Sequence, residues 1–198
     1  MPELPEVETV CLALSKIINN SKVRNIKIFR RDLRWNIKDN LKKDLENDVL
    51  KKPYRRGKYI LIPTFKENIF LIHLGMSGQI KISSNYNNFL KHDHFQMIIE
   101  TKANSTHSIV YNDPRRFGFI DHFSIKEIEN HFLLKKLGVE PLSDDFTLEY
   151  LNSKISQKVV CIKNILMDQT IIAGIGNIYA SEILHRAEIN PLRSAVSL

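Results

Sequence analysis

Residues 59–82, YILIPTFKENIFLIHLGMSGQIKI, decide the fold class of this 198-residue chain. They alternate apolar runs of strand length with polar or glycine-containing turns. Working outward, Ile26 and Ile28 alternate with polar neighbours, and strand-length runs recur at 59–62, 69–74, 79–82, 95–100, 108–111 and 117–120. Short strands without long helices between them are typical of an antiparallel sandwich or barrel.

Helical patterns lie on both sides of this region. Pro5 and the acidic residues beside it suit the first turn of a helix, and apolar residues at helical spacing follow as far as Ile18. From about residue 125 the pattern is helical again, with 141–145 as a connection ending in a helix cap. Two helices, 161–168 and 178–186, flank a glycine turn. We therefore predict an α+β fold, with an antiparallel β-sandwich domain carrying an N-terminal helix at 1–135 and an all-α domain at 136–198.

The charge distribution indicates a polyanionic partner. The net charge is +7, and residues 22–58 alone contain 14 Lys or Arg against 5 Asp or Glu. A dispersed basic face suits nucleic acid or an anionic membrane, although a merely soluble basic protein is the alternative. No apolar run approaches the roughly 18 residues of a membrane span. We expect no membrane partner.

Compartment and metal content can also be judged from the sequence. The two cysteines, Cys11 and Cys161, are far apart and form neither a disulfide framework nor a cysteine zinc site. The acidic, proline-bearing N-terminus is unlike a signal peptide. His92 and His94 lack a third ligand nearby, so we expect no metal site. These features predict a cytoplasmic protein.

The N-terminal Pro2-Glu3 pair carries candidate catalytic chemistry. If Met1 is removed, Pro2 presents a secondary amine, and an α-amino group ordinarily titrates at about 7.7–8.0. Such an amine can attack a sugar C1′ and form a cationic iminium, which is an electron sink for elimination. Glu3 could supply the proton that opens the sugar ring. The competing explanation for this pair, when it is considered alone, is that the chain begins with Met-Pro by chance.

Three loops carry candidate DNA contacts, and each has a plain structural alternative. Lys58 follows a basic turn and could hold a phosphate. Met76 lies between two glycines and could wedge into a base stack, while His73 could contact phosphate. In the turn 112–118, Arg115 could hydrogen-bond an orphaned base and Phe117 could fill the gap left by a flipped nucleotide. The alternatives are solvated charged turns, a partly buried methionine and a core phenylalanine.

The segment 173–182, AGIGNIYASE, predicts a glycine turn leading into a helix capped by Asn177. Backbone N–H groups at a helix start bind phosphate well. A helix, glycine turn and helix in a basic protein favour DNA binding.

Taken in order, five segments closely resemble the formamidopyrimidine-DNA glycosylase family: MPELPEVET (1–9), HLGMSG (73–78), DPRRFG (113–118), LGVEPL (137–142) and AGIGNIYASE (173–182). The resemblance covers essentially the whole chain. It implies a β-sandwich domain followed by a helix-two-turn-helix domain in a bacterial, nucleoid-associated monomer. It further implies excision of 8-oxoguanine and formamidopyrimidines from damaged double-stranded DNA, followed by β- and δ-elimination at the abasic site.

The resemblance also assigns roles to residues of this chain. Pro2 is the expected nucleophile and Glu3 the proton donor, with Lys58 near the lesion phosphate. Met76, Arg115 and Phe117 are the expected void-filling residues, and Arg115 reads the opposite cytosine. Asn177 is the expected phosphate-binding residue of the helix-two-turn-helix. The related endonuclease VIII branch, which acts on pyrimidine lesions, shares the Pro-Glu start, but it usually has a different residue at position 4 and groups its wedge residues in one loop. Leu4, Met76 and the segment 113–117 favour the purine-lesion branch.

Members of the family usually continue into further helices and a four-cysteine zinc finger, which this sequence does not contain. We therefore expect no cofactor in this chain, and we expect it to be cut short relative to the family. Three possibilities stay open: an active glycosylase and lyase of reduced affinity, a non-catalytic binder of damaged or abasic DNA, and a fragment that folds poorly alone.

Overall fold

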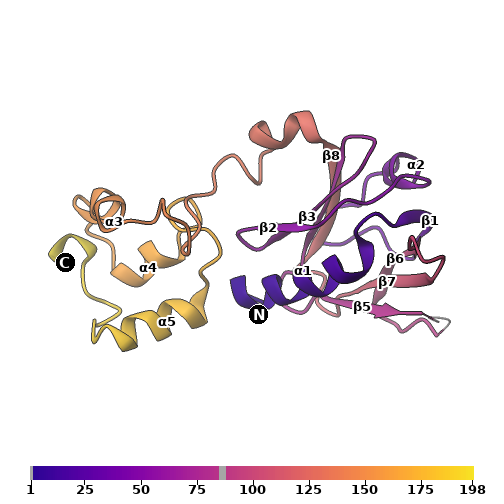
Figure 1. Cartoon of the computed structure of the whole chain (residues 1–198). Coiled ribbons are helices and arrows are strands. Elements are labelled where there is room, and N and C mark those ends of the chain that lie inside the picture. Colours follow the sequence, from indigo (N-terminus) through magenta and orange to yellow (C-terminus); the bar gives the residue numbers. More distant parts are fainter. Residues whose placement is uncertain (1, 85–87) are drawn as a thin grey trace. The chain divides into compact units, whose positions relative to one another are not determined.

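The structure is a computed structural model that describes residues 2–84 and 88–198 (Figure 1). The chain divides into two compact units. The first runs to Arg55 and resumes over Tyr59–Ile128, and the second combines Arg56–Lys58 with Glu129–Leu198. Among the described residues, none of the helices is both long and apolar enough to cross a membrane.

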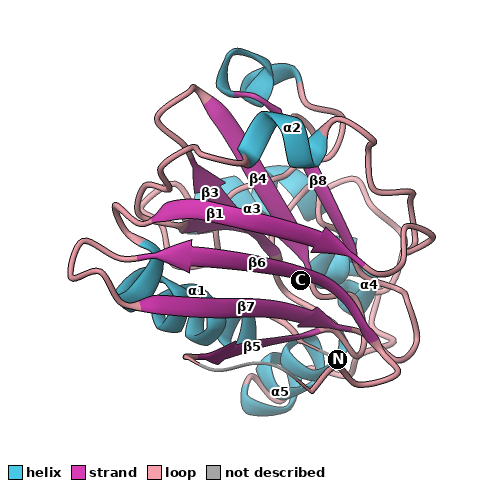
Figure 2. Cartoon of the chain, turned by 90° about the vertical axis from the view of Figure 1, so that its right-hand side faces the viewer, coloured by secondary structure: helices cyan, strands magenta, loops and turns pink. Residues whose placement is uncertain are grey.

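The first unit contains two four-stranded sheets. One has the order β1-β6-β7-β5, and Figure 2 shows these strands side by side. The other has the order β2-β3-β4-β8. The strands are β1 (Lys22–Ile28), β2 (Tyr54–Arg56), β3 (Tyr59–Pro63), β4 (Asn68–His73), β5 (Gln79–Ser83), β6 (Asp93–Glu100), β7 (Thr106–Asn112) and β8 (Phe119–Ser124). Their pairings are antiparallel, which confirms the predicted α+β class with antiparallel sheets.

The N-terminal helix α1 (Leu4–Ile18) forms because its first turn is well capped. Glu3 and Glu6 make a reciprocal capping box, in which the Glu6 carboxylate accepts a 2.9 Å hydrogen bond from the Glu3 backbone N–H. One apolar stripe of the helix enters the core together with side chains from both sheets. Its buried members are Leu4, Val7, Cys11, Leu14 and Ile18.

The second unit is helical. Its elements are α3 (Leu148–Ile155), α4 (Ile162–Met167), α5 (Asn177–Arg186) and the short 3-10 helix η2 (Ala195–Ser197); another 3-10 helix, η1 (Ile125–Asn130), precedes them. Helices α4 and α5 match the predicted helices 161–168 and 178–186. Thr147, just beyond the predicted connection, caps α3 by accepting a 3.0 Å bond from the Tyr150 backbone N–H. The prediction that Asn177 caps α5 is wrong. Gly176 is the cap, because its extended backbone lets its carbonyl accept from Ala180 at 2.9 Å.

Candidate functional site

Pro2 and Glu3 lie at the start of α1. Pro2 is half-buried, whereas Glu3 is only 1% exposed. The Glu3 carboxylate accepts the backbone N–H of Glu6, so the helix start fixes its position. A carboxylate held in this way stands one residue from the predicted nucleophile, and it can act on a proton only at a defined place.

Two loops of the first unit touch backbone to backbone. Gly75 has φ of +62°, and a Cβ there would lie 2.3 Å from the Gly118 nitrogen. A Cβ on Gly118 would lie 1.9 Å from the Tyr111 hydroxyl oxygen and 2.4 Å from the His73 carbonyl oxygen. Only glycine fits at these positions. The loops 74–78 and 113–118 are therefore held in a close pair.

The buried carboxylate of Asp113 organises this loop pair. Asp113 is 0% exposed. One of its oxygens accepts the Ser77 hydroxyl and the Arg115 backbone N–H, and the other accepts the Gly118 backbone N–H at 2.9 Å and the Tyr111 hydroxyl at 3.2 Å. Burial next to this carboxylate raises the pKa of Tyr111 far above its usual value, so its hydroxyl stays a donor. One side chain thus ties together segments that are far apart in sequence.

The loop pair presents three of the predicted site residues to solvent. Met76 is 40% exposed and Phe117 is 45% exposed, so the alternative that Phe117 enters the core is wrong. The Arg115 guanidinium lies 4.7 Å from the Phe117 ring centroid, in a cation–π contact. An exposed thioether, an aromatic ring and a guanidinium can together enter a base stack and offer hydrogen bonds there.

His73 ends β4 immediately before the loop pair. Its Nδ1 accepts the Gly75 backbone N–H at 3.2 Å, so the neutral ring carries its proton on Nε2. The ring stacks on Phe119 at 5.0 Å between centroids and leans on Tyr59 at 5.1 Å. These contacts therefore fix the orientation of the ring.

The second unit contains Lys58 and Asn177. The Lys58 ammonium donates to the carbonyl of Ile175 at 3.1 Å, in the glycine turn before α5. Asn177 is exposed at the first position of α5. The lysine therefore contacts the turn two residues before this exposed helix start.

The sequence analysis missed the residues that hold this turn and the tip of the β2–β3 hairpin. Gln169 donates to the Ile175 carbonyl at 2.7 Å and accepts from the Gly174 backbone N–H at 2.8 Å. Glu140 accepts from Arg56 at 2.8 Å and from the Gly57 backbone N–H at 2.7 Å. Glu140 lies in the segment 137–142, but nothing in its local sequence indicates that it anchors a hairpin.

The histidine-containing stretch 91–94 is structural. His94 is 2% exposed and its Nε2 lies 2.8 Å from the Asp113 carbonyl oxygen. Asp93 accepts from Lys81 at 3.1 Å and from Asn112 at 2.7 Å. Over residues 2–84 and 88–198, no three His, Cys, Asp or Glu side chains gather as a metal site. The residues described therefore do not fit the zinc that the family resemblance implies.

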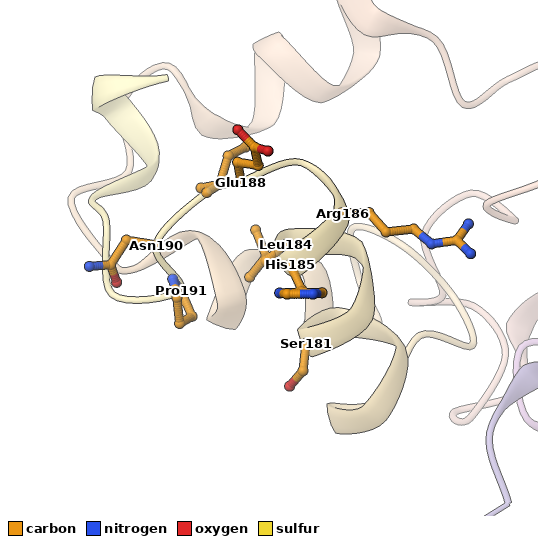
Figure 3. A pocket seen from close by; sticks show the side chains of 8 residues that line it. Ser181, Leu184, His185, Arg186, Glu188, Asn190 and Pro191 are labelled. Carbon is orange, nitrogen blue, oxygen red and sulfur yellow. The ribbon is translucent and has the colours of Figure 1, made fainter.

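An open pocket lies at the C-terminal end of α5 (Figure 3). It is lined by Ser181, Leu184, His185, Arg186, Glu188, Ile189, Asn190 and Pro191. None of the predicted site residues lines it.

Family models match both parts of the chain. One, described as the formamidopyrimidine-DNA glycosylase N-terminal domain, matches residues 1–120, and another, described as the formamidopyrimidine-DNA glycosylase H2TH domain, matches residues 137–198. The formamidopyrimidine-DNA glycosylase of Bartonella quintana is 42% identical over 206 residues, covering 100% of this chain and 71% of the relative. That of Cellvibrio japonicus is 43% identical over 198 residues, with the same coverage.

Solved structures agree. A complex between a mutant of the LlFpg protein and DNA containing THF aligns with a TM-score of 0.90 and 33% identity, covering 100% of this chain and 71% of that one. Lactococcus lactis formamidopyrimidine-DNA glycosylase, bound non-covalently to DNA containing an AP site, aligns with the same score and identity and is covered to 74%.

The fold and these matches place the chain in the class of DNA glycosylases of base excision repair. Both family models and the curated relatives agree on one branch of that class. The chain belongs to the formamidopyrimidine-DNA glycosylase family.

Proposed function

We propose that this chain binds damaged double-stranded DNA, excises oxidised purines such as 8-oxoguanine and formamidopyrimidines, and nicks the strand through an N-terminal proline Schiff base. The observation that carries the proposal is the start of α1, where Pro2 adjoins the buried, helix-fixed carboxylate of Glu3. Family membership supports the substrate class, and several related structures hold DNA with an abasic or modified nucleotide.

The chemistry begins with the amine of Pro2, which becomes available when Met1 is removed. Its lone pair attacks C1′ of the damaged nucleotide, and the bond between C1′ and the base nitrogen breaks, so the base leaves with that electron pair and takes up a proton. The C1′–O4′ bond then opens, and O4′ takes a proton for which Glu3 is the donor. A secondary amine leaves no N–H on the product, so the result is a cationic iminium.

The iminium acts as the electron sink for strand cleavage. Loss of a proton from C2′ expels the 3′ phosphate, which is β-elimination. A second proton loss, from C4′, expels the 5′ phosphate, which is δ-elimination. Water then hydrolyses the iminium and returns the Pro2 amine, so the overall sequence consumes no oxidant or reductant.

The loop pair and the glycine turn supply the DNA contacts in this proposal. Met76 and Phe117 fill the space left by the extruded nucleotide, and Arg115 hydrogen-bonds the base opposite the lesion. His73, Lys58 and Asn177 contact phosphates. Their exposure and partners support these roles: Met76, Arg115, Phe117 and Asn177 reach solvent, and His73 has a fixed ring.

The test is borohydride trapping with a duplex that pairs 8-oxoguanine with cytosine. We expect a covalent protein–DNA adduct on a denaturing gel. The adduct should weaken for Pro2→Gly, because the new primary amine gives an imine that is not cationic until it is protonated. It should persist for Pro5→Gly, a matched control that changes a proline in the first turn of the same helix. Intact mass measurement must accompany the assay, because retained Met1 would block the amine.

Two results would contradict the proposal. Folded protein lacking Met1 that yields no adduct with either an 8-oxoguanine or an abasic duplex would favour a non-catalytic binder. A wild-type adduct that peptide mapping places on a residue other than Pro2 would put the nucleophile elsewhere. A strong preference for oxidised pyrimidines over 8-oxoguanine would contradict the purine assignment alone.

A further inference from the structure

The carboxylate of Asp32 lies between two guanidinium groups of the first unit. It accepts two hydrogen bonds from Arg30, at 2.6 and 2.9 Å, and its Oδ2 lies 2.7 Å from Nη1 of Arg116. The side chains of Arg30, Asp32 and Arg116 are 48%, 57% and 42% exposed. The hydrogen bonds from Arg30 lower the pKa of Asp32, so the carboxylate stays charged at neutral pH. A single exposed anion is thus shared by two cations.

This cluster adjoins the loop pair. The Arg34 backbone N–H donates to the Gly118 carbonyl at 3.2 Å, which joins the segment 29–37 to the loop 113–118. Arg116 itself has a left-handed backbone, with φ of +58°, between Arg115 and Phe117. The loop turns Arg116 toward Asp32, whereas the Arg115 guanidinium lies over the Phe117 ring. Two neighbouring arginines therefore point to different partners.

We propose that Arg30 and Arg116 form a binding site for a DNA backbone phosphate, and that Asp32 occupies this site in the free protein until DNA displaces it. Guanidinium groups bind carboxylate and phosphate in the same forked geometry, so the Asp32 carboxylate stands in for a phosphate oxygen pair. The inference rests on the proposed function only in that the ligand is duplex DNA.

Displacement costs little because the ion pairs are exposed. Ion pairs of this kind contribute little to stability, and salt screens them. A backbone phosphate repeats along DNA and its binding releases condensed counterions, a gain that the tethered carboxylate cannot supply. Asp32 therefore lowers the affinity for DNA without closing the surface.

The direction in which one substitution changes the affinity for DNA tests the proposal. Asp32→Asn keeps the size of the side chain but removes the competing charge, so we expect tighter binding of an undamaged duplex, by about fivefold at low salt. The matched control is Asp39→Asn, because Asp39 pairs with an arginine outside the cluster, Arg31, at 2.9 Å and its side chain is 96% exposed. It removes the same charge from a neighbouring turn, and we expect a change below about twofold.

Binding is measured by fluorescence anisotropy over a salt series from about 50 to about 200 mM. The gain from Asp32→Asn should shrink as salt rises and shrink further in an Arg116→Gln background. It should disappear when Arg30→Gln is added to that background, because both released arginines are then absent. A melting curve for each variant verifies folding.

Equal or weaker binding by Asp32→Asn would overturn the inference, because Asp32 would then merely support the loop. An equal gain from Asp39→Asn, or a full gain that persists with both Arg30→Gln and Arg116→Gln, would also overturn it, because the effect would then be long-range charge alone. These assays use undamaged DNA and need no Pro2 chemistry. They can therefore fail while borohydride trapping succeeds, and the converse also holds.

Discussion

The loop pair should depend on Asp113 more than on any other single side chain. In Asp113→Ala the Gly118 backbone N–H, which is buried, loses its acceptor. The Tyr111 hydroxyl keeps a second acceptor, the His73 carbonyl at 3.3 Å, and the Arg115 N–H keeps the Ser77 hydroxyl at 3.1 Å. The variant therefore loses stability mainly for two reasons. The Gly118 N–H is left without an acceptor, and a charge-assisted hydrogen bond is lost.

That cost can be sized. A hydrogen bond to a charged group contributes about 1.5–3 kcal/mol, and a stranded buried donor costs a similar amount. We expect a loss of about 2–3 kcal/mol for Asp113→Ala. In a chain of this length, that corresponds to a melting temperature lower by about 5–10 °C. Asp113→Asn should lose only about 1 kcal/mol, because the amide oxygen can keep the Gly118 N–H while the Ser77 hydroxyl turns to accept from the amide nitrogen.

Two measurements on the same variants separate stability from function. Thermal unfolding should rank wild type above Asp113→Asn and Asp113→Ala. Affinity for a duplex with an abasic site should fall in the same order, by about tenfold for the alanine variant, because Met76 and Phe117 lose their fixed support. Asp48→Ala is the control: Asp48 is also buried, at 2% exposed, but it accepts from Lys66, at the opposite end of β4.

The reasoning fails if Asp113→Ala melts like wild type, since the hydrogen bonds of Asp113 would then contribute nothing to stability. It also fails if Asp113→Ala and Asp48→Ala lose equal stability and bind the abasic duplex equally well. In that case the carboxylate would support the unit as a whole and not the loop pair.

Three further predictions concern packing, titration and the glycine turn. Gly118→Ala should destabilise the first unit by about 3 kcal/mol, because the new methyl group meets Tyr111, and an unchanged melting curve would contradict this. Burial, and then the charge of Glu8, raise the pKa of Cys11 to about 11, so its thiolate appears only as the pH rises toward that value. Iodoacetamide near neutral pH should therefore modify Cys161 alone in folded protein and both cysteines in urea, as mass spectrometry would show. Gln169→Leu should weaken binding of undamaged duplex by severalfold, because the turn before α5 loses two side-chain hydrogen bonds; anisotropy equal to wild type would contradict it.

The strands and long helices were predictable because their burial repeats along the chain. The buried residues of α1 recur every three or four positions, and β3 and β4 are nearly continuous apolar runs. The elements that were missed, β2 and α2 (Leu41–Leu45), are too short to show a period. They form because contacts with neighbouring elements fix their backbone, and the local sequence does not indicate those contacts.

The candidate site likewise has residues that the sequence predicts and contacts that it does not predict. Met76 and Phe117 were predictable because glycines or charged residues flank them, and such flanks indicate turns. The contact of Ser77 with Asp113 was not predictable, because it depends on how β4, β5 and β7 are ordered and paired. The grouping of Arg56–Lys58 with the helical unit was equally hidden, since it depends on hydrogen bonds to residues more than eighty positions away.

The rigidity of the loop pair bears directly on its proposed role. Ordering the backbone of one residue costs about 1–2 kcal/mol, so ordering the loop 74–78 upon binding would cost about 5–10 kcal/mol. A micromolar complex has only about 8 kcal/mol of binding free energy in total. A loop that had to order itself could therefore cancel the affinity it was meant to provide. Because Gly75, Gly118 and Asp113 fix the backbone beforehand, only the side chains of Met76, Arg115 and Phe117 remain to be ordered, at about 0.5–1.5 kcal/mol each.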